Sequence, residues 1–383
     1  MRNWLLPEYI EDILPIEARH IELMRRQIID LLFVHGYQQV IPPLLEYIES
    51  LLSGSGGDMD LRIFKVIDQL SGRLMGLRAD MTPQAARIDA HLLNCDGITR
   101  LCYASSILHT IPFGITQTRE PLQIGAELYG HSGLESDLEI QQLMLQCLSV
   151  VGINQIHLDL GHVGVFRGLI KRGGISTELE TELFAVLQAK DIASLKELSS
   201  KLKKTTREAL LLLPELYGDK KVLVVAAEHL PDYPEVNKAL DELAAIERDL
   251  KISVDKVAFD LSDLRGYHYH TGIVFAAYTY GSSNAVALGG RYDEIGKAFG
   301  RARPATGFSM DLKALSRLNK PQQYPKGIRA PFDMNNKELQ AQIAALRKSG
   351  QIVVVDLPGN TEGLDDYDRE LIFSKGKWIV KEI

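Results

Sequence analysis

The sequence of 383 residues has few cysteines and no long apolar run. Its three cysteines, Cys95, Cys102 and Cys147, are scattered and form no Cys-x-x-Cys pair. This spacing disfavours a zinc site or a disulfide framework and predicts reduced thiols. No stretch approaches the ~20 apolar residues of a membrane span, and the first residues include acids where a signal peptide needs an apolar run. We therefore expect a soluble, cytoplasmic protein with no membrane contact.

The sequence also has no surplus of positive charge. Lysine and arginine number 43 against 50 acidic residues, which gives a net charge of −7. Nucleic-acid-binding proteins usually have a basic excess on at least one domain, whereas the basic clusters here are short, such as residues 201–204. The charge balance therefore argues against tRNA binding.

Composition and pattern divide the chain into regions. A hydrophobic content of 45% and a charged content of 24% are typical of a globular protein, and the length suffices for two or three domains. Residues 175–250 have an almost wholly helical pattern. After residue 319, prolines and a glycine at 321–327 indicate a linker. The rest offers a helix at 336–349, a strand at 351–356 and a hairpin-like end, which we interpret as a remnant of a larger domain or as an unrelated small cap.

The most informative stretch lies between residues 99 and 130. Two apolar-rich segments, 99–104 and 122–129, flank a connection with two prolines and a glycine, which predicts a long strand, a wide loop and an antiparallel return strand. In the return strand Gln123 and Glu127 are four residues apart and share one face. A buried carboxylate needs polar partners. A small cationic or amino-bearing ligand would supply them, and a polar network inside the core is the alternative.

Two further segments contain candidate ligand-binding residues. Thr82 and Pro83 predict the start of a helix that runs to residue 93, with Thr82 as its N-cap. Asp80 precedes the positive helix end, where a carboxylate is stabilised even without a ligand. Farther on, Arg265 is either a buried ion-pair partner or a bidentate group for a ligand carboxylate.

His268 and His270 alternate on a predicted strand and would share one face, as two metal ligands can. No third ligand is in register with them, so we predict that they pack in the core and that no metal binds.

In order along residues 5–318, these segments resemble the signature motifs of class II aminoacyl-tRNA synthetases, most closely the histidyl-tRNA synthetases. Residues 36–46 resemble the first motif, 100–130 the second and 307–312 the start of the third. The Arg-Gly at 265–266 and the Gly-Gly-Arg-Tyr-Asp at 289–293 resemble two further signatures of that family.

The resemblance implies an α+β fold with an antiparallel sheet flanked by helices. It implies a class II synthetase-like core at 1–174 and 251–318, a helical insertion at 175–250 and a small C-terminal α/β domain at 319–383.

The resemblance also implies a histidine-binding site. Asp80 stands where the family has a glutamate that holds the α-amino group of histidine, and His270 replaces a tyrosine that walls the imidazole. The two acids would meet the α-ammonium group and the imidazole N–H, and Arg265 would meet the carboxylate. The implied histidine-binding residues are Asp80, Thr82, Gln123, Glu127, Arg265, Tyr269, His270 and Tyr292.

The chain departs from these synthetases at the positions that bind ATP. His109 and Ile111 stand where the family has an Arg-x-Glu that clamps the phosphates, and Ala314 stands where an arginine stacks on adenine. Activation of an amino acid with ATP needs preorganised positive charge on the phosphates. We therefore predict that the chain is not catalytic, has lost aminoacylation and uses no cofactor.

A histidyl-tRNA synthetase-like chain without these arginines and without room for an anticodon-binding domain resembles the regulatory subunits of hetero-oligomeric ATP phosphoribosyltransferase. The resemblance implies a subunit that is needed for full activity of the short catalytic subunit and for feedback inhibition by L-histidine, in the first step of histidine biosynthesis. It implies homodimers formed through the first motif, within a hetero-octamer. Two alternatives remain open: a histidine-activating enzyme, and a free-standing histidine sensor or tRNA-mimic binding protein.

Overall fold

The computed structural model describes residues 4–53, 57–112, 118–250, 254–267, 269–319, 326–359 and 367–383. The chain divides into two compact units, Met1–Lys320 and Pro321–Ile383. Of the helices within the described residues, none combines the length and the apolar character that crossing a membrane requires.

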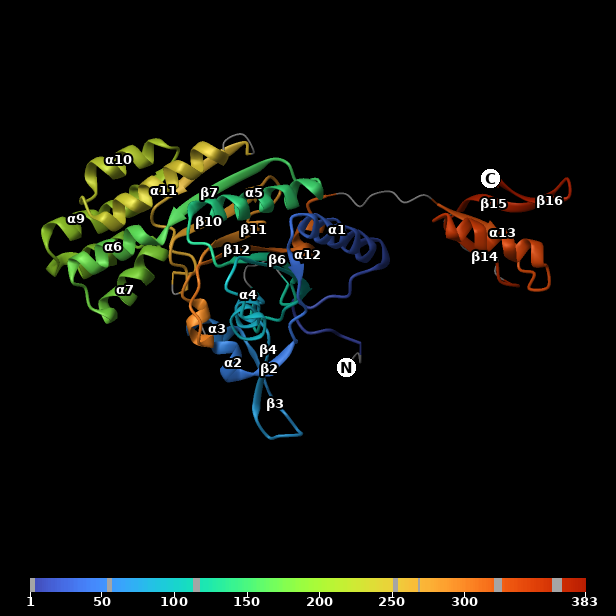
Figure 1. Cartoon of the computed structure of the whole chain (residues 1–383), viewed down its shortest axis with the longest axis horizontal. Coiled ribbons are helices and arrows are strands. Elements are labelled where there is room, and N and C mark those ends of the chain that lie inside the picture. The colour runs from blue at the N-terminus through green and yellow to red at the C-terminus, as the bar shows by residue number, and fades with distance from the viewer. Residues whose placement is uncertain are drawn as a thin grey trace. The chain divides into compact units, whose positions relative to one another are not determined.

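The larger unit is built on a nine-stranded sheet with the order β1-β5-β6-β12-β11-β10-β7-β9-β8 (Figure 1). The strands from β5 to β7 in this order are all antiparallel, whereas β1 with β5 and β7 with β9 are parallel. The bounds are β1 (Gln38–Gln39), β5 (Thr99–Ser106), β6 (Leu122–Tyr129), β7 (Ile156–His162), β8 (Tyr217–Gly218), β9 (Lys256–Asp260), β10 (Ile273–Thr279), β11 (Ala287–Arg291) and β12 (Ala305–Asp311).

The predicted strand pair β5–β6 is confirmed, although part of its connection lies outside the described residues. The antiparallel register places Tyr103 opposite Gly125, and β12 places Gly307 opposite Glu127 on the other side of β6. Ile124, Ala126 and Leu128 of β6 belong to the main hydrophobic core. Because side chains alternate along a strand, Gln123, Gly125 and Glu127 face the other side of the sheet.

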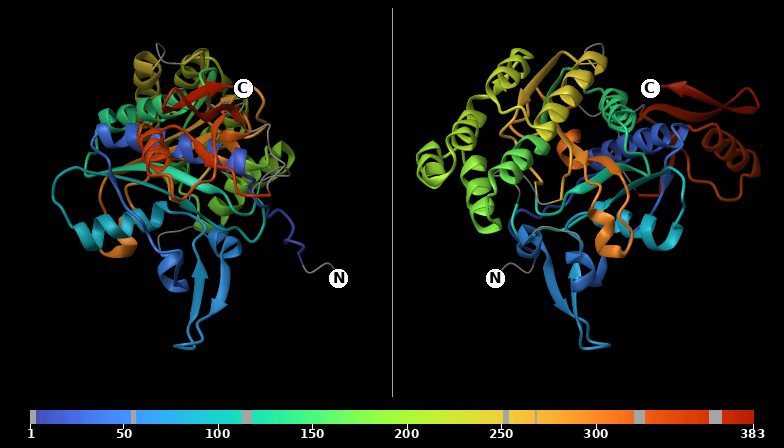
Figure 2. Two further views of the ribbon diagram at one scale, coloured as in Figure 1. Left: turned by 90° about the vertical axis from the view of Figure 1, so that its right-hand side faces the viewer. Right: turned by 60° about the vertical axis from the view of Figure 1, so that its left-hand side comes forward.

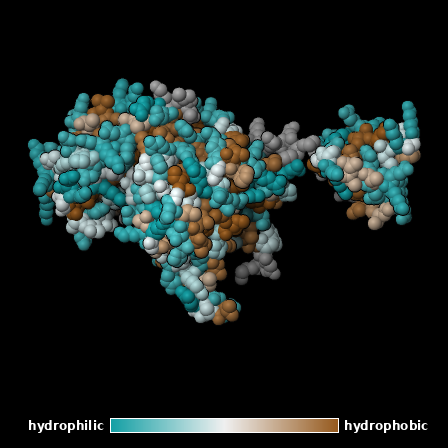
Figure 3. All heavy atoms as spheres, viewed as in Figure 1, coloured by the Kyte–Doolittle hydropathy of each residue, from teal (hydrophilic) through white to brown (hydrophobic). Residues whose placement is uncertain are grey.

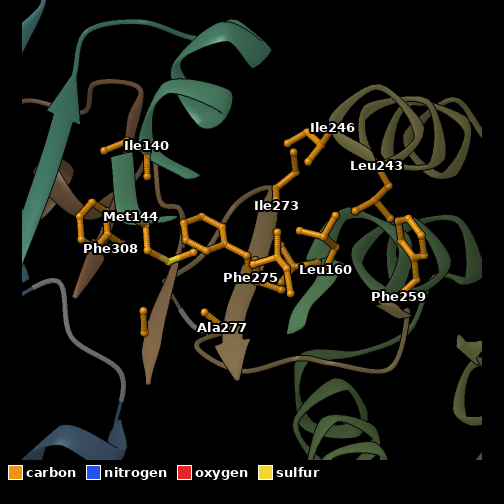
Figure 4. Packing of buried hydrophobic residues seen from close by; sticks show 14 of the residues in the cluster. Ile140, Met144, Leu160, Leu243, Ile246, Phe259, Ile273, Phe275, Ala277 and Phe308 are labelled. Atoms are coloured by element: carbon orange, nitrogen blue, oxygen red, sulfur yellow. The ribbon is translucent and has the colours of Figure 1, made fainter. Parts of the chain in front are cut away.

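Helices cover the face of the sheet that carries the main core. In Figure 4, Ile140 and Met144 of α5 lie beside Phe308 and Phe275 of the sheet. Burial of such side chains contributes about 25 cal/mol per Å² of apolar surface removed from water, so this layer holds the sheet in place. The helices packed on this face are α1 (Pro15–Val34), α5 (Leu134–Val150), α6 (Val163–Gly173) and α11 (Pro234–Leu250).

Residues 175–250 are mainly helical, as predicted. The helices are α7 (Thr177–Gln188), α8 (Ile192–Leu198), η2 (Ser199–Lys201), α9 (Lys204–Leu212), η3 (Leu213–Glu215), α10 (Lys221–His229) and α11. They gather at one end of the large sheet (Figure 2). The strand β8 within this region was not predicted, because two residues are too few to show a periodicity. It joins the edge of the large sheet, and α11 packs on β7 and β10.

A small sheet of order β2-β4-β3 projects from the larger unit (Figure 2). It consists of β2 (Leu45–Tyr47), β3 (Phe64–Ile67) and β4 (Leu74–Leu77), with α2 (Ile48–Leu52) and α3 (Gly57–Arg62) between β2 and β3. Its strands pair antiparallel, and the turn after β3 carries Leu70, which is 95% exposed.

The helix predicted from Thr82 to residue 93 is present in two forms. It begins as α4 (Thr82–Arg87) and continues as a π-helix, η1 (Ile88–Leu93). Thr82 is the first helical residue and Met81 precedes it, so the predicted N-cap was wrong by one position. The capping oxygen comes from Asp80, which accepts the backbone N–H of Thr82 at 3.1 Å. Two short helices, η4 (Ile295–Phe299) and α12 (Leu312–Ser316), complete this unit.

The smaller unit is a four-stranded sheet, β14-β13-β15-β16, with one helix. Its elements are β13 (Gly327–Ala330), α13 (Lys337–Lys348), β14 (Val353–Val355), β15 (Tyr367–Ser374) and β16 (Lys377–Glu382). Leu339 and Ile343 of α13 pack on Ile328 and Leu371 in a core of its own. The predicted helix, strand and hairpin are confirmed, but the assignment of residue 327 to a linker was wrong, because it begins the central strand β13.

Candidate ligand-binding site

A cavity of about 400 Å³ opens on the face of β6 that does not pack on α5. This volume lies in the range of small-molecule sites. The eight sequence-predicted residues come from separate segments of the chain, and the structure brings all of them to the cavity wall: Asp80, Thr82, Gln123, Glu127, Arg265, Tyr269, His270 and Tyr292.

The floor beside Glu127 is made of glycine. Glu127 lies opposite Gly307 of β12, which in turn lies opposite Gly290 of β11. A Cβ at Gly307 would come within 1.6 Å of the Glu127 Oε2 atom, and one at Gly290 within 2.8 Å of the His270 Nε2 atom. Side chains at either position would therefore fill the space that the carboxyl and the imidazole occupy. The two glycines make a flat hollow in the sheet.

Glu127 is fully buried between two tyrosines. The Tyr103 hydroxyl donates to Oε1 at 2.8 Å and the Tyr292 hydroxyl donates to Oε2. Burial raises the pKa of the Glu127 carboxyl to about 8, and the hydroxyl bonds offset part of that rise. A carboxyl with this pKa is mainly neutral at pH 7.

Tyr103 was missed in the sequence, although it contacts the predicted site directly. It is completely buried, and its hydroxyl lies 3.2 Å from the Thr82 Oγ1 atom. Tyr103 lies opposite Gly125 and therefore on the cavity face of the sheet. Its contact with the site could be predicted only once the register of β5 against β6 was known.

Asp80 and Gln123 form a second polar group in the cavity. The Gln123 Nε2 atom donates to Asp80 Oδ1 at 2.8 Å, and the Gln123 Oε1 atom accepts the Met81 N–H at 3.0 Å. Asp80 is half-buried, in contrast to Glu127. The helix-capping role of Asp80 and its position at the cavity wall are thus present together.

Arg265 forms an ion pair with Asp263, and an ion pair was one of the two roles predicted for Arg265 from the sequence. Its Nε atom lies 2.9 Å from Asp263 Oδ1 and its Nη2 atom 2.5 Å from Asp263 Oδ2, while Nη1 donates to the Tyr278 hydroxyl at 2.9 Å. The guanidinium is only partly buried and lines the cavity. It is therefore held in place at the wall by groups of the protein.

His270 does not lie on a strand, and this prediction was wrong because β10 begins three residues later, at Ile273. Its Nδ1 atom is 3.1 Å from the Arg265 carbonyl oxygen, and its ring lies 4.1 Å from that of Tyr269. Burial lowers the pKa of the His270 imidazole to about 4, so the ring is neutral. His268 lies outside the described residues. Among those that the structure describes, no group of three His, Cys, Asp or Glu side chains is placed to hold a metal ion.

The three positions at which the sequence predicts the loss of ATP-binding residues have different surroundings. His109 lines the cavity, with its Nε2 atom 2.8 Å from the Ala79 carbonyl oxygen, and burial lowers the pKa of its imidazole. Ile111 is 61% exposed, and Ala314 lies in α12. Within the described residues, the cationic side chains at the cavity wall are Arg62 and Arg265.

Comparison with known proteins agrees with this geometry. Residues 9–315 match the histidyl-tRNA synthetase family, and residues 325–381 match the ATP phosphoribosyltransferase subunit HisZ C-terminal domain. The small unit is therefore a recognised domain and not an unrelated cap. Proteins named ATP phosphoribosyltransferase regulatory subunit are 65% identical in Nitrosomonas eutropha, over 99% of both chains, and 63% identical in Nitrosomonas europaea, over 100% of both.

Solved structures agree as well. An ATP phosphoribosyltransferase regulatory subunit/histidyl-tRNA synthetase from Bacillus halodurans superposes with a TM-score of 0.84 at 26% identity, covering 97% of this chain and 98% of that one. A histidyl-tRNA synthetase from Nostoc has a TM-score of 0.75 at 18% identity, covering 99% and 94% respectively, and shares the fold. The predicted class II synthetase-like α+β fold is thereby confirmed. Given its full-length relatives and its C-terminal domain, the chain belongs to the family of ATP phosphoribosyltransferase regulatory subunits.

Proposed function

We propose that the chain is a non-catalytic regulatory subunit of ATP phosphoribosyltransferase, and that its cavity binds L-histidine as the feedback inhibitor of histidine biosynthesis. The observation that carries the histidine site is the cavity itself, in which Asp80, Gln123, Glu127 and Arg265 lie around a flat hollow. Full-length relatives that carry the name regulatory subunit support the role of the chain.

The surroundings of each polar group favour one orientation of histidine. Asp80 is the more open acid and suits the α-ammonium group, which is strongly hydrated. Glu127 lies deep beside aromatic rings and suits the imidazole. Arg265, held by Asp263, presents a guanidinium to the ligand carboxylate. Each ionic group of histidine then meets a group of opposite charge.

The charges around the cavity support the absence of catalysis. Transfer chemistry on ATP needs several preorganised cations around the phosphates. His109 is neutral in its buried position, and Ala314 provides no charge. We propose that these replacements leave the histidine site without the phosphate clamp of a synthetase.

Exposed hydrophobic side chains support assembly with other subunits. They occur at the end of α1, between β1 and β2, and on the β3–β4 hairpin, where Figure 3 shows hydrophobic side chains at the tip. Exposed apolar surface of this kind marks interaction sites. We propose that this region, which includes the first motif, forms a homodimer within a hetero-octamer that contains the short catalytic subunit. Representative residues are Phe33, Val34, Ile41, Leu44, Ile67 and Leu70.

The test is phosphoribosyl transfer to ATP by the short catalytic subunit, with and without this chain, titrated with histidine. We expect the chain to raise the rate and to make it histidine-sensitive, because an effector regulates when it binds one state of the complex more tightly. Glu127→Ala should weaken inhibition at least ~10-fold, the equivalent of ~1.4 kcal/mol, and leave the activation intact. The matched control Glu208→Ala removes an exposed glutamate of α9 outside the cavity and should change neither. An unchanged rate and histidine response would contradict the proposal.

A further inference from the structure

Asp80 and Glu127, the two acids proposed to contact histidine, differ in what surrounds them. Asp80 is half-buried and bonds to an amide and a backbone N–H. Glu127 is 1% exposed, and each of its carboxyl oxygens accepts a hydroxyl proton from a tyrosine. Two accepted hydroxyl protons help to stabilise a carboxylate, but a buried carboxyl loses its proton readily only when a cation lies beside it.

No cation of the described residues supplies that charge. The neighbouring strand β12 contributes only Gly307, and the other groups facing Glu127 are hydroxyls or a second acid. From β5, β6, the residue after β11, the start of α4 and the segment before β10, these groups are Tyr103, Tyr129, Tyr292, Thr82, Asp80 and Tyr269. The cavity therefore has a place for a positive charge and leaves it to a ligand.

The space next to Glu127 is flat and aromatic. The rings of Tyr269, His270 and Tyr292 lie with their centroids 4.1 to 6.4 Å apart, over the floor formed by Gly290 and Gly307. A planar ring fits such a hollow, and the faces of tyrosine rings attract cations. An imidazolium ion combines the shape and the charge that this end of the cavity requires.

We propose that the site binds the histidine ring as an imidazolium ion paired with the carboxylate of Glu127. This inference rests on the proposed histidine-binding function. On binding, the O–H bond of the Glu127 carboxyl breaks and an N–H bond forms on the ring, so one proton passes from the protein to the ligand. At neutral pH Glu127 can supply this proton, since burial raises the pKa of its carboxyl to about 8.

The inference makes histidine affinity depend on pH in a defined way. Below the ordinary imidazole pKa of about 6.5, ligand and carboxyl each hold a proton before binding, and one must leave. Above pH 8 both have lost theirs, and one must be taken up from solvent. We therefore expect the tightest binding between these limits.

The test is nitrogen NMR of histidine labelled with ¹⁵N in the ring and bound to the full-length chain at pH 7.5, where the free ring is neutral. We expect both ring nitrogens to show the chemical shifts of the charged ring. In the Glu127→Gln variant the bound ring should be neutral. The matched variant Asp80→Asn alters the acid proposed to meet the α-ammonium group, so it should weaken binding and leave the ring charged.

Calorimetry provides a second measurement. In buffers with different ionisation heats at pH 8.5, wild-type protein should take up about three quarters of a proton more per histidine than Glu127→Gln does, because a carboxyl with a pKa of about 8 is mostly ionised at this pH. Neutral ring nitrogens in the wild-type complex, or equal proton uptake by the two proteins, overturn the imidazolium proposal. Absence of any histidine binding by the wild-type chain overturns the proposed function as well.

Discussion

Burial of the Glu127 carboxyl in the cavity lowers the stability of the folded chain at neutral pH. A carboxyl with a pKa raised to about 8 favours the folded state in its neutral form. The unfolded chain loses that proton near pH 4.5, so the contribution of Glu127 to stability is fully present below this value and is lost as pH rises through about 8. Each unit of pKa difference corresponds to about 1.4 kcal/mol.

We therefore predict that Glu127→Gln removes this decrease of stability with rising pH, because the amide side chain does not ionise in this range. Between pH 5 and 8, the free energy of unfolding of the variant should rise relative to wild type in the absence of histidine. Urea denaturation at several pH values measures the difference. A pH-independent difference would show that Glu127 is ionised in the empty cavity.

Gly307 is a second residue on which the site depends. We predict that Gly307→Ala weakens histidine binding at least ~10-fold and lowers stability by ~1–3 kcal/mol, because the added Cβ collides with the Glu127 carboxyl. Titration calorimetry and thermal unfolding measure the two effects. Gly97→Ala is the matched control, since a Cβ there meets nothing within 4 Å. Normal histidine binding by Gly307→Ala would mean that Glu127 does not contact the ligand.

At the scale of elements, a buried ion pair joins the π-helix η1 to the segment before β12. The Arg303 Nη1 atom lies 2.9 Å from Asp89 Oδ1, and both side chains are less than 10% exposed. Arg303 also donates to the Gly97 carbonyl oxygen. This contact connects the helix that follows Asp80 with the strand that carries Gly307, and thus both sides of the cavity.

We predict that Asp89→Ala costs about 3–5 kcal/mol, because it leaves a buried guanidinium without its counter-ion. Denaturant unfolding measures the loss. The exposed pair between Lys204 and Glu208 is the comparison, and Glu208→Ala should change stability by less than ~1 kcal/mol. If Asp89→Ala also lowered the free energy of unfolding by less than ~1 kcal/mol, solvent would have to reach Arg303.

At the scale of the whole molecule, the two units have separate hydrophobic cores. The core of the larger unit runs from Ile21 to Leu315, and that of the smaller unit from Ile328 to Leu371. Units with their own cores are expected to fold independently. All the described residues that line the cavity belong to the larger unit.

We therefore predict that a fragment of residues 1–319 folds and binds histidine with an affinity within ~3-fold of the full chain, a difference below ~1 kcal/mol. Circular dichroism and calorimetry check this. Assays of this fragment with the short catalytic subunit would then show whether the HisZ C-terminal domain is needed for assembly. An unfolded fragment would show that the smaller unit stabilises the larger one.

Much of the fold and of the site followed from local sequence signals. Alternation and turn residues located β5 and β6, and proline with an acid marked the start of α4. The same alternation placed Gln123 and Glu127 on one face, and the motifs indicated the family that the comparisons confirm. These signals are readable because they depend on neighbours along the chain.

Tertiary structure alone decided how distant segments meet. The register between β5 and β6 brought Tyr103 to Glu127, and the approach of Asp263 settled which partner Arg265 has in this structure. The order of β6, β12 and β11 turned two separate glycines into one flat floor. Such contacts depend on strand pairing and packing between residues far apart in sequence, and no local periodicity encodes them.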